Sequence, residues 1–262
     1  MHKPRFFEFL DFAWLPDSLR DAATDDLRFK WERGGLYKPI AARLARLLAA
    51  TGSGNVLDLA SGGGGPIWAV YRHLAHNGVD LRVTLTDKFP NLPAFAYLKK
   101  ISDGGVGFIE EPLDVTAIPP DLEGIRTLFA SAHHFPPETL TAILQDAVDL
   151  GRPIAIFDVS APPTPPPPLM LLLCMPPGVL LTSPFIRPFR WSRLFWTFVL
   201  PLLPLLVLWD AQVSAVRAYS VKQLEGIVRE LPPNDYVWEI GREPFPNTIT
   251  YLTGYPPATA AR

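Results

Sequence analysis

The sequence contains one cysteine, Cys174, among its 262 residues. A single thiol cannot form a disulfide within the chain, and it cannot supply a metal site built from several thiolates. Such cysteine usage is typical of a reducing compartment. The first ten residues also lack the apolar core and small-residue cleavage site of a secretory signal. We therefore expect a cytoplasmic protein.

Basic residues are too few and too dispersed to suggest a nucleic-acid-binding surface. The chain has 24 Lys and Arg against 26 Asp and Glu, and its formal net charge is −2. Proteins that bind a phosphate backbone gather Lys and Arg on one face. The one modest group here is Arg187, Arg190 and Arg193, which would form a solvated helix face or contact anionic headgroups. Nucleic acid is therefore not an expected partner.

Strand and helix patterns alternate along most of the chain. Short apolar runs predict buried strands, and apolar residues three or four positions apart predict helices. This alternation is typical of a doubly wound α/β fold, with a mostly parallel sheet covered by helices on both faces. We predict seven strands, the last two forming a C-terminal antiparallel hairpin. The predicted strands are 55–59, 81–86, 105–109, 125–130, 153–158, 236–241 and 248–254, and the predicted helices are 39–50, 66–76, 91–101, 137–150 and 220–230.

Two segments lie outside this alternation. Residues 1–36 predict a helical, aromatic-rich N-terminal extension that ends at two glycines. Residues 161–210 begin with a proline-rich linker and continue as an apolar, helical insertion after the fifth strand. The remaining residues, 37–160 and 211–262, are predicted to form one domain.

A glycine-rich turn, Asp58-Leu59-Ala60-Ser61-Gly62-Gly63-Gly64-Gly65, joins the first predicted strand to a helix. Glycines let a ligand approach the backbone, and the helix N-terminus offers unpaired N–H groups. A dinucleotide fingerprint counted from Gly62 requires a small residue where the chain has Ile67, which disfavours a nicotinamide cofactor. A plain tight turn is the remaining alternative, although four consecutive glycines cost it backbone entropy.

The run Val56 to Gly64 resembles motif I of class I S-adenosylmethionine-dependent methyltransferases, in which an acidic strand residue precedes G-x-G-x-G. Ala60 stands in place of the first glycine. The resemblance covers roughly residues 38–160 and 211–254, and it implies methyl transfer with S-adenosyl-L-methionine as cofactor. The cofactor-binding residues that it implies are Asp58, Ala60, Ser61, Gly62, Gly64, Asp87, Lys88, Asp114, Val115 and Ser131.

Two acidic positions beyond the turn support this resemblance. Asp87 ends the second predicted strand, where the family places a carboxylate on the ribose hydroxyls. Asp114 and Val115 follow the third strand, where the family contacts the adenine. The alternative is that Asp87 is a strand-end turn residue and Asp114 a solvated loop residue.

His133 and His134 follow the fourth predicted strand, at the sheet edge where open α/β sheets bind ligands. Either imidazole is a candidate catalytic base, needed only if the methyl acceptor carries a proton that must leave. The alternative, which we favour, is that both histidines line or brace the cofactor pocket. No ordered group of Asp and Asn suggests a magnesium site, although Asp158 at the end of strand five leaves an opening for one. We predict no metal ligands.

The insertion leaves three interpretations open. Its apolar stretches, 169–181 and 194–209, are shorter than the roughly 20 residues of a spanning helix, and prolines interrupt both. The insertion is a hydrophobic lid over the active site, a hairpin that contacts a membrane through 169–209, or a homodimer interface. The first two are compatible, and they would place the protein peripherally on the inner face of the membrane.

The leading hypothesis is therefore methyl transfer to a lipophilic small molecule or a lipid-like acceptor. Two alternatives stay open. One is a non-catalytic, membrane-associated protein that binds S-adenosylmethionine, and the other is a nicotinamide-dependent oxidoreductase.

Overall fold

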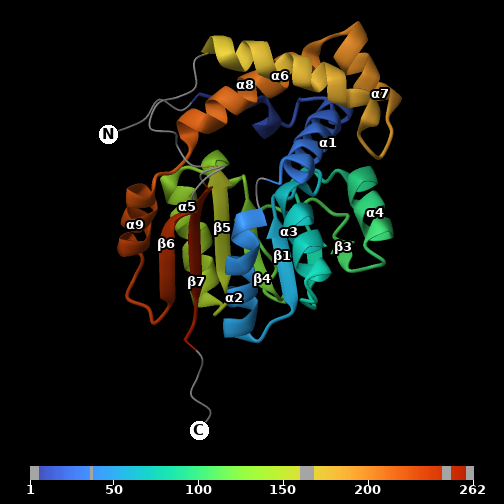
Figure 1. The fold of residues 1–262 in the computed structure, drawn as a ribbon. Helices are drawn as coiled ribbons and strands as arrows, with labels where there is room; N and C mark the ends of the chain where they lie inside the picture. The colour runs from blue at the N-terminus through green and yellow to red at the C-terminus, as the bar shows by residue number, and fades with distance from the viewer. Residues whose placement is uncertain (1–5, 36–37, 160–167, 244–248, 258–262) are drawn as a thin grey trace.

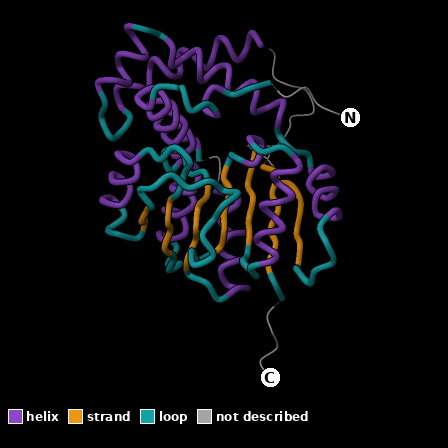
Figure 2. Tube along the Cα trace, turned by 180° about the vertical axis from the view of Figure 1, so that it is seen from behind, coloured by secondary structure: helices purple, strands orange, loops and turns teal. Residues whose placement is uncertain are grey.

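A computed structural model of the chain describes residues 6–35, 38–159, 168–243 and 249–257. The described residues form a sheet with helices on both faces and a helical cap over one edge of the sheet (Figures 1 and 2). The glycine-rich turn lies at that edge, where the parallel strands end.

Seven strands form one sheet in the order β3-β2-β1-β4-β5-β7-β6. The first five are parallel, and β7 pairs antiparallel with both β5 and β6. The predicted fold class is confirmed, and each predicted strand is present with ends that differ by at most two residues; residue 248 of the last one lies outside the described residues. The strands are β1 Asn55–Leu59, β2 Arg82–Leu85, β3 Val106–Phe108, β4 Ile125–Phe129, β5 Ile154–Val159, β6 Val237–Glu243 and β7 Ile249–Tyr255.

Two apolar clusters fix helices to the two faces of the sheet. On one face, Leu44, Ile67 and Phe95 belong to a single buried cluster. On the other face, Leu144 and Leu224 belong to a second cluster. The helices of the first face are α2 Ala41–Thr51, α3 Gly65–His76 and α4 Leu92–Ile101, and those of the second are α5 Pro137–Asp149 and α9 Val221–Glu230.

The N-terminal extension and the insertion pack together as one cap. Leu15, Leu19 and Ala22 from the extension share a small core with Val179 and Leu203 from the insertion. Burying these side chains removes apolar surface that neither segment could cover alone. The cap consists of η1 Phe9–Asp11, α1 Asp17–Gly34, α6 Pro168–Thr182, η4 Ser183–Phe185, α7 Trp191–Leu194, the π-helical η5 Phe195–Val199 and α8 Leu202–Arg217.

Helix α8 corrects the predicted end of the insertion. The apolar pattern stops at Trp209, so the sequence places a boundary at 210. The helix continues to Arg217, because its last two turns carry polar residues that bind the N-terminal segment. Asp210, for example, accepts hydrogen bonds from the backbone N–H groups of Phe9 and Leu10, at 2.8 and 3.2 Å.

None of the helices in the described part of the chain is by itself long and apolar enough to cross a membrane. Residues 191–199 and 202–217 meet the criteria of length and composition only when taken together, and they meet at an angle of 84°. Leu200 and Pro201 lie at the break, consistent with the disruption that proline imposes on a helix.

A buried ion cluster joins α1 to α7. The Asp25 carboxylate is completely buried and accepts from Arg190 Nε at 2.9 Å and from Arg193 Nη1 at 2.8 Å. Arg193 also donates to the backbone carbonyls of Ser183 and Ile186. Arg190 and Arg193 thus neither form a solvated helix face nor contact headgroups, because their guanidinium groups pair with Asp25 inside the cap.

We predict that Asp25→Asn lowers the free energy of unfolding by about 3 kcal/mol, because it leaves buried arginines without a counter-charge. The matched control is Asp17→Asn on the same helix, where the side chain is 92% exposed and pairs with Arg20. This control is expected to cost less than about 1 kcal/mol. Urea denaturation measures both, and equal costs would contradict the structural role given to the cluster.

Candidate ligand cavity at the carboxyl edge of the sheet

A cavity of about 420 Å³ lies between the cap and the carboxyl ends of β1, β2 and β4. Its floor is built by the loops that follow these strands. Its roof is built by the N-terminal segment, through Leu10, Asp11, Arg20, Leu27 and Trp31 among others. Of the predicted site residues, Ala60, Ser61, Gly62, Asp87, Lys88, Asp114, Val115, Ser131 and His134 line the cavity.

The glycine-rich turn has little room for side chains. Gly62 and Gly64 have φ angles of 57° and 81°, in the left-handed region that favours glycine. A Cβ atom on Gly64 would collide with the Leu98 side chain of α4, so this glycine serves packing and lies outside the cavity wall. Ala60 also has a left-handed φ, 54°, which explains why the related motif has glycine at this position.

Asp58 braces the glycine-rich turn from below and does not line the cavity, so its predicted contact with the cofactor stays a prediction. Its Oδ1 accepts from Thr127 Oγ1 and its Oδ2 from Ser61 Oγ, both at 2.7 Å. The residue is only 1% exposed and does not line the cavity. Burial raises the pKa of Asp58 to about 7, against the lowering effect of these two hydrogen bonds.

Asp87 links the end of β2 to the glycine-rich turn. Its Oδ2 accepts from the Gly62 N–H at 2.7 Å, and its Oδ1 accepts from the Phe89 N–H at 2.8 Å. A carboxylate has about four acceptor positions, so two remain for a ligand in the cavity. Burial raises the pKa of Asp87, and the two backbone N–H donors oppose this shift.

Asp114 lies at the more exposed end of the cavity. It pairs with Lys88, with 2.9 Å between Oδ2 and Nζ, and it also accepts from Thr116. These partners, Lys88 first, lower the pKa of Asp114 to about 2. Asp114 is therefore an anion at neutral pH, on a partly exposed loop between β3 and β4.

Ser131 brings an unpaired hydroxyl to the cavity wall. Its Oγ is buried, and among the described residues it has no hydrogen-bond partner. Buried hydroxyls in folded proteins are nearly always hydrogen-bonded. The Ser131 hydroxyl is therefore available to a bound ligand.

Sequence reasoning missed the roof of the cavity. Thr24 and Trp31 on α1 line it, yet their spacing follows no motif that connects them to the glycine-rich turn. One signal was present in the sequence. Residues 17–34 carry charged residues on every side, a pattern that a stable helix needs polar partners to support. In the structure Arg20, Asp25 and Arg28 of this helix are buried.

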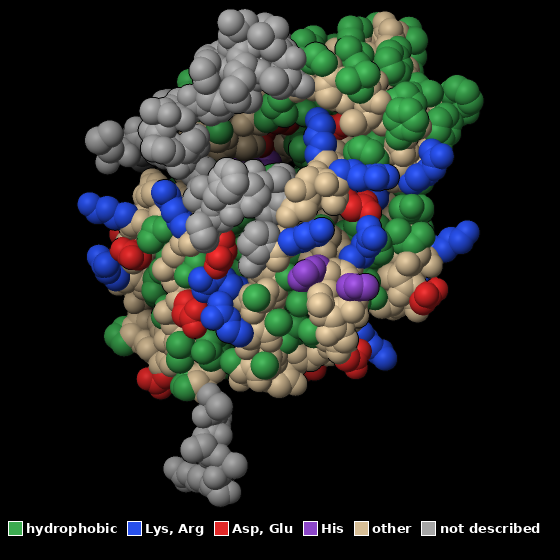
Figure 3. Space-filling view, in the orientation of Figure 1, with side chains coloured by type: hydrophobic (Ala, Val, Ile, Leu, Met, Phe, Trp, Pro, Cys, Tyr) green, Lys and Arg blue, Asp and Glu red, His purple; other side chains and the backbone are tan. Residues whose placement is uncertain are grey.

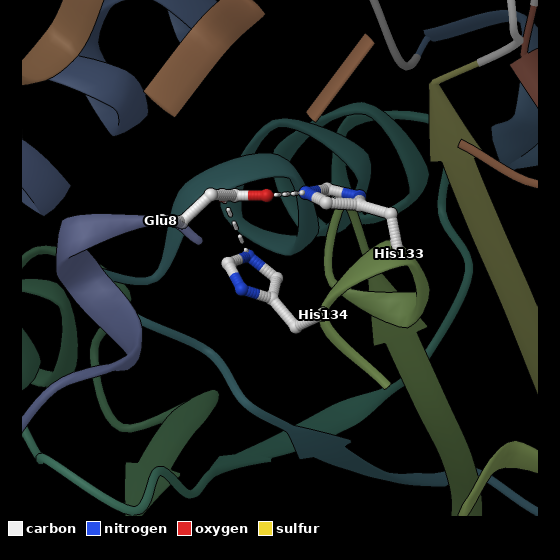
Figure 4. Close-up of side chains that lie close together, drawn as sticks. All are labelled: Glu8, His133 and His134. Carbon is white, nitrogen blue, oxygen red and sulfur yellow. Dashed lines mark ion pairs between the residues drawn. The ribbon is translucent and has the colours of Figure 1, made fainter. Parts of the chain in front are cut away.

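His133 and His134 lie beside the cavity on η3 Ala132–His134, and Glu8 points between them from the N-terminal segment (Figure 4). The Glu8 Oε1 atom is 3.8 Å from His133 Nε2, and its Oε2 atom is 3.5 Å from His134 Nε2. The other nitrogen of each ring also faces a carboxylate. His133 Nδ1 is 2.8 Å from Asp158 Oδ1, and His134 Nδ1 is 2.6 Å from Asp11 Oδ1.

This arrangement favours bracing over proton abstraction for the two histidines. Burial alone would lower the pKa of His134, but Glu8 and Asp11 outweigh it and raise the pKa to about 9. His134 is therefore protonated at neutral pH, and a protonated imidazole is no base. His133 is 4% exposed and is not part of the cavity wall. The role of general base, which the sequence suggested as one option for either ring, stays a prediction.

Comparison with known proteins rests on structure alone. No protein-family model matches the chain, and no curated protein matches its sequence. The plantazolicin methyltransferase BpumL in complex with SAH is similar in structure, with a TM-score of 0.51 and 11% sequence identity, over 92% of this chain and 96% of that one. At this identity the likeness establishes the fold, a methyltransferase-like α/β fold, as the sequence predicted.

Two further structures are similar at lower scores. An O-methyltransferase family protein from Burkholderia thailandensis has 16% identity and a TM-score of 0.47, over 85% of this chain and 56% of that one. The magnesium protoporphyrin IX methyltransferase from Synechocystis PCC 6803, with bound SAH, has 15% identity and a TM-score of 0.48, over 87% and 86%. The chain thus spans about half the length of the Burkholderia protein.

The buried carboxyl of Asp58 predicts a pH dependence of stability. The folded state holds a proton up to a pKa of about 7, whereas a free Asp releases it near 3.8. Stability from this group is therefore present at low pH and is lost as pH rises between these values, by at most about 1.4 kcal/mol per pH unit.

In urea denaturation at pH 5 to 8, we expect the wild type to lose stability relative to Asp58→Asn as pH rises, because the variant has no proton to release. The exposed Asp121→Asn serves as control, and its difference from the wild type is expected to stay flat. A flat difference for Asp58→Asn as well would show that the carboxyl is not perturbed.

Proposed function

We propose that this chain is a methyltransferase that uses S-adenosyl-L-methionine. The observation that carries the proposal is the cavity, which combines the glycine-rich turn after β1 with Asp87 after β2 and the Asp114-Val115 pair after β3. BpumL, which shares the fold, was solved in complex with SAH. The bound cofactor would supply a methyl group on a sulfonium, open to in-line attack by an acceptor.

The residues of the cavity suit the parts of this cofactor. Asp87 retains two acceptor positions, which match the two ribose hydroxyls. Phe89 and Val115 offer apolar surface for the adenine, and the Arg20 guanidinium lies 4.1 Å over the Phe89 ring and holds it in place. The free Ser131 hydroxyl provides a hydrogen bond near the end of β4. Because α1 roofs these groups, it would exclude water from the reacting atoms.

A nicotinamide cofactor fits less well. Ile67 is 1% exposed and occupies the position at which a dinucleotide fold needs a small residue for close packing of helix and strand. The antiparallel β7-β6 pair also sets this sheet apart from an open dinucleotide-binding sheet. An oxidoreductase is therefore the weaker proposal.

Isothermal titration calorimetry tests the cofactor. We expect S-adenosylmethionine and S-adenosylhomocysteine to bind, and Asp87→Asn to weaken both by about 10- to 100-fold, the loss of a charge-assisted hydrogen bond. The control is Asp80→Asn. Asp80 is exposed and lies just before the first residue of β2, at the other edge of the sheet, so this variant should bind both ligands as the wild type does.

Binding of NADH in place of both ligands would favour the oxidoreductase. Binding of S-adenosylmethionine without methyl transfer to any component of a lipid extract would favour a non-catalytic protein. Equal affinity of wild type and Asp87→Asn would contradict the placement of the ribose.

We further propose that the acceptor is lipophilic. Beyond the cofactor residues, the cavity wall includes four apolar side chains, Leu10, Leu27, Trp31 and Phe135, beside the polar Asp11, Arg20, Thr24 and His134. The apolar side chains would bind a hydrocarbon or aromatic surface. Asp11, Arg20 and His134 already pair with other residues of the chain.

The outer side of the cap supports delivery of such an acceptor from a membrane. Hydrophobic side chains gather there, on the upper right of Figure 3. Trp191 is 77% exposed, Leu181 73% and Phe185 70%. No Asp or Glu occurs between residues 159 and 209, so the insertion itself brings no carboxylate to a contact with lipid. We call the exposed residues Leu181, Phe185, Trp191, Phe198, Val199, Leu200 and Leu205 the apolar cap face.

The apolar cap face is proposed to lie on the membrane rather than to close over the cavity. None of the described residues of 175–217 lines the cavity, whose roof is α1. We therefore propose that the lid over the cavity is formed by the N-terminal extension and not by the insertion. Exposed Trp and Phe on a face without acidic residues suit a headgroup boundary, and a homodimer through the same face is the competing proposal.

Flotation with liposomes tests this face. We expect the triple variant Leu181→Ser, Phe185→Ser, Trp191→Ser to float several-fold less than the wild type, because it loses apolar area that the bilayer would bury. The matched control replaces three exposed apolar residues of the sheet half, Leu92, Ile101 and Leu150, by serine. A wild type that sediments as a dimer and does not float would favour the homodimer, and equal flotation of all three proteins would reject the membrane proposal.

A further inference from the structure

We propose that Glu8, His133 and His134 form a binding site for a divalent transition-metal ion, with Zn²⁺ as the probe of choice. Each residue offers one ligand atom, and the three atoms lie within 4.8 Å of one another. Figure 4 shows the Glu8 carboxylate directed between the two imidazoles. Glu8 and His133 are buried, and His134 reaches the cavity wall. The site is independent of the proposed methyl transfer.

The distances suit a small metal ion. Bonds of about 2.0–2.1 Å from Zn²⁺ to nitrogen and oxygen place the ligand atoms of a tetrahedral site about 3.3 Å apart. The Glu8 oxygens are 3.5 and 3.8 Å from the two imidazole Nε2 atoms. All three ligand atoms lie within 4.8 Å of one another, so side-chain movements of up to about 1.5 Å would bring them to the spacing of a tetrahedral site.

The second nitrogen of each imidazole is already held as metal-binding histidines usually hold it. A ligating histidine commonly donates its other ring N–H to a carboxylate, which fixes the tautomer and the ring orientation. Here Asp158 contacts Nδ1 of His133, and Asp11 contacts Nδ1 of His134. Both Nε2 atoms are thereby directed toward Glu8. One such pair is common in proteins, whereas two that converge on a third carboxylate indicate a shared ligand.

Glu8 itself is fixed in position. Its Oε1 accepts from Arg217 Nη1 and its Oε2 from Ser214 Oγ, both at 3.1 Å. The backbone just after Glu8 is held by Asp210. A metal ligand held by its neighbours loses little freedom when the ion binds.

The charge of the cluster also favours a cation. Glu8, Asp11, Asp158 and Asp210 bring four carboxyl groups together, and Arg217 is the described Lys or Arg that pairs with Glu8 and Asp11. Buried carboxylates are costly unless positive charge offsets them. A divalent ion between the two imidazoles would supply it, and protonated imidazoles are the competing source.

The ligand set defines the class of ion. Two imidazole nitrogens with one carboxylate oxygen suit Zn²⁺ and other late first-row ions, rather than Mg²⁺ or Ca²⁺. Three protein ligands leave a coordination position open, as in catalytic rather than structural zinc sites.

Metal content of the full-length protein tests the site. Protein stripped with a chelator is dialysed against Zn²⁺, and bound zinc is measured by mass spectrometry and by calorimetric titration. We expect one equivalent per chain, bound at least tenfold more weakly by Glu8→Gln and by Asp158→Asn. The control is the double variant His73→Gln, His76→Gln, which removes two exposed histidines that lie three residues apart on α3, the spacing at which two side chains of a helix are neighbours.

Two results would overturn the proposal: unchanged zinc affinity in Glu8→Gln, or loss of the equivalent in the His73, His76 double variant. Circular dichroism establishes whether each variant folds. If Glu8→Gln does not fold, anomalous scattering from zinc-soaked crystals of the wild type decides. A peak between Glu8 and the two imidazoles supports the site, and a peak elsewhere or none at all refutes it.

Discussion

Buried charge holds the parts of the cap together and binds them to the sheet edge, and the cavity depends on that attachment. Asp25 binds α1 to the arginines of the insertion and accepts from Asn91 at the start of α4. Arg217 binds α8 to Glu8 and Asp11 of the N-terminal segment and donates to the backbone carbonyl of His134 after β4. Apolar packing inside the cap is modest by comparison with the two clusters that flank the sheet. Ion pairs are directional, so they fix where the cap sits, whereas apolar contact alone would tolerate sliding. Without them the roof of the cavity has no fixed position.

The floor of the cavity follows the same logic on a smaller scale. Asp58 beneath the glycine-rich turn and Asp87 beside it hold the turn from two directions, through Ser61 and the Gly62 N–H respectively. The Asp58 carboxyl is used to hold the turn, whereas the Asp87 carboxylate keeps acceptor positions for a ligand in the cavity. Two acidic residues that look equivalent in the sequence thus have different roles, because one lies within the strand and the other lies just after a strand end.

The sheet and its helices could be predicted from the sequence because their signals are local. Apolar runs, the proline after the glycine-rich turn and the capping pair Ser220 and Gln223 each specify an element within a few residues of themselves. The floor of the cavity was predictable for the same reason, since strand ends of a parallel sheet converge on one edge. The roof was not. Glu8 and His133 are 125 positions apart in the sequence but lie close together in the structure. Two adjacent histidines do not have the spacing of a known metal-binding motif.

The cap therefore has two unlike sides. Neither the N-terminal extension nor the insertion predicts this difference by its own sequence. Its inner side is charged and fixes α1 over the cavity, and its outer side is apolar and exposed. Two of the three arginines between residues 159 and 209, Arg190 and Arg193, are directed inward, so the exposed Arg187 is the remaining charged residue of that stretch. Under the proposed function this division is coherent. A polar cofactor would meet carboxylates at the sheet edge, and an apolar acceptor would arrive from a surface that the outer side of the same cap contacts.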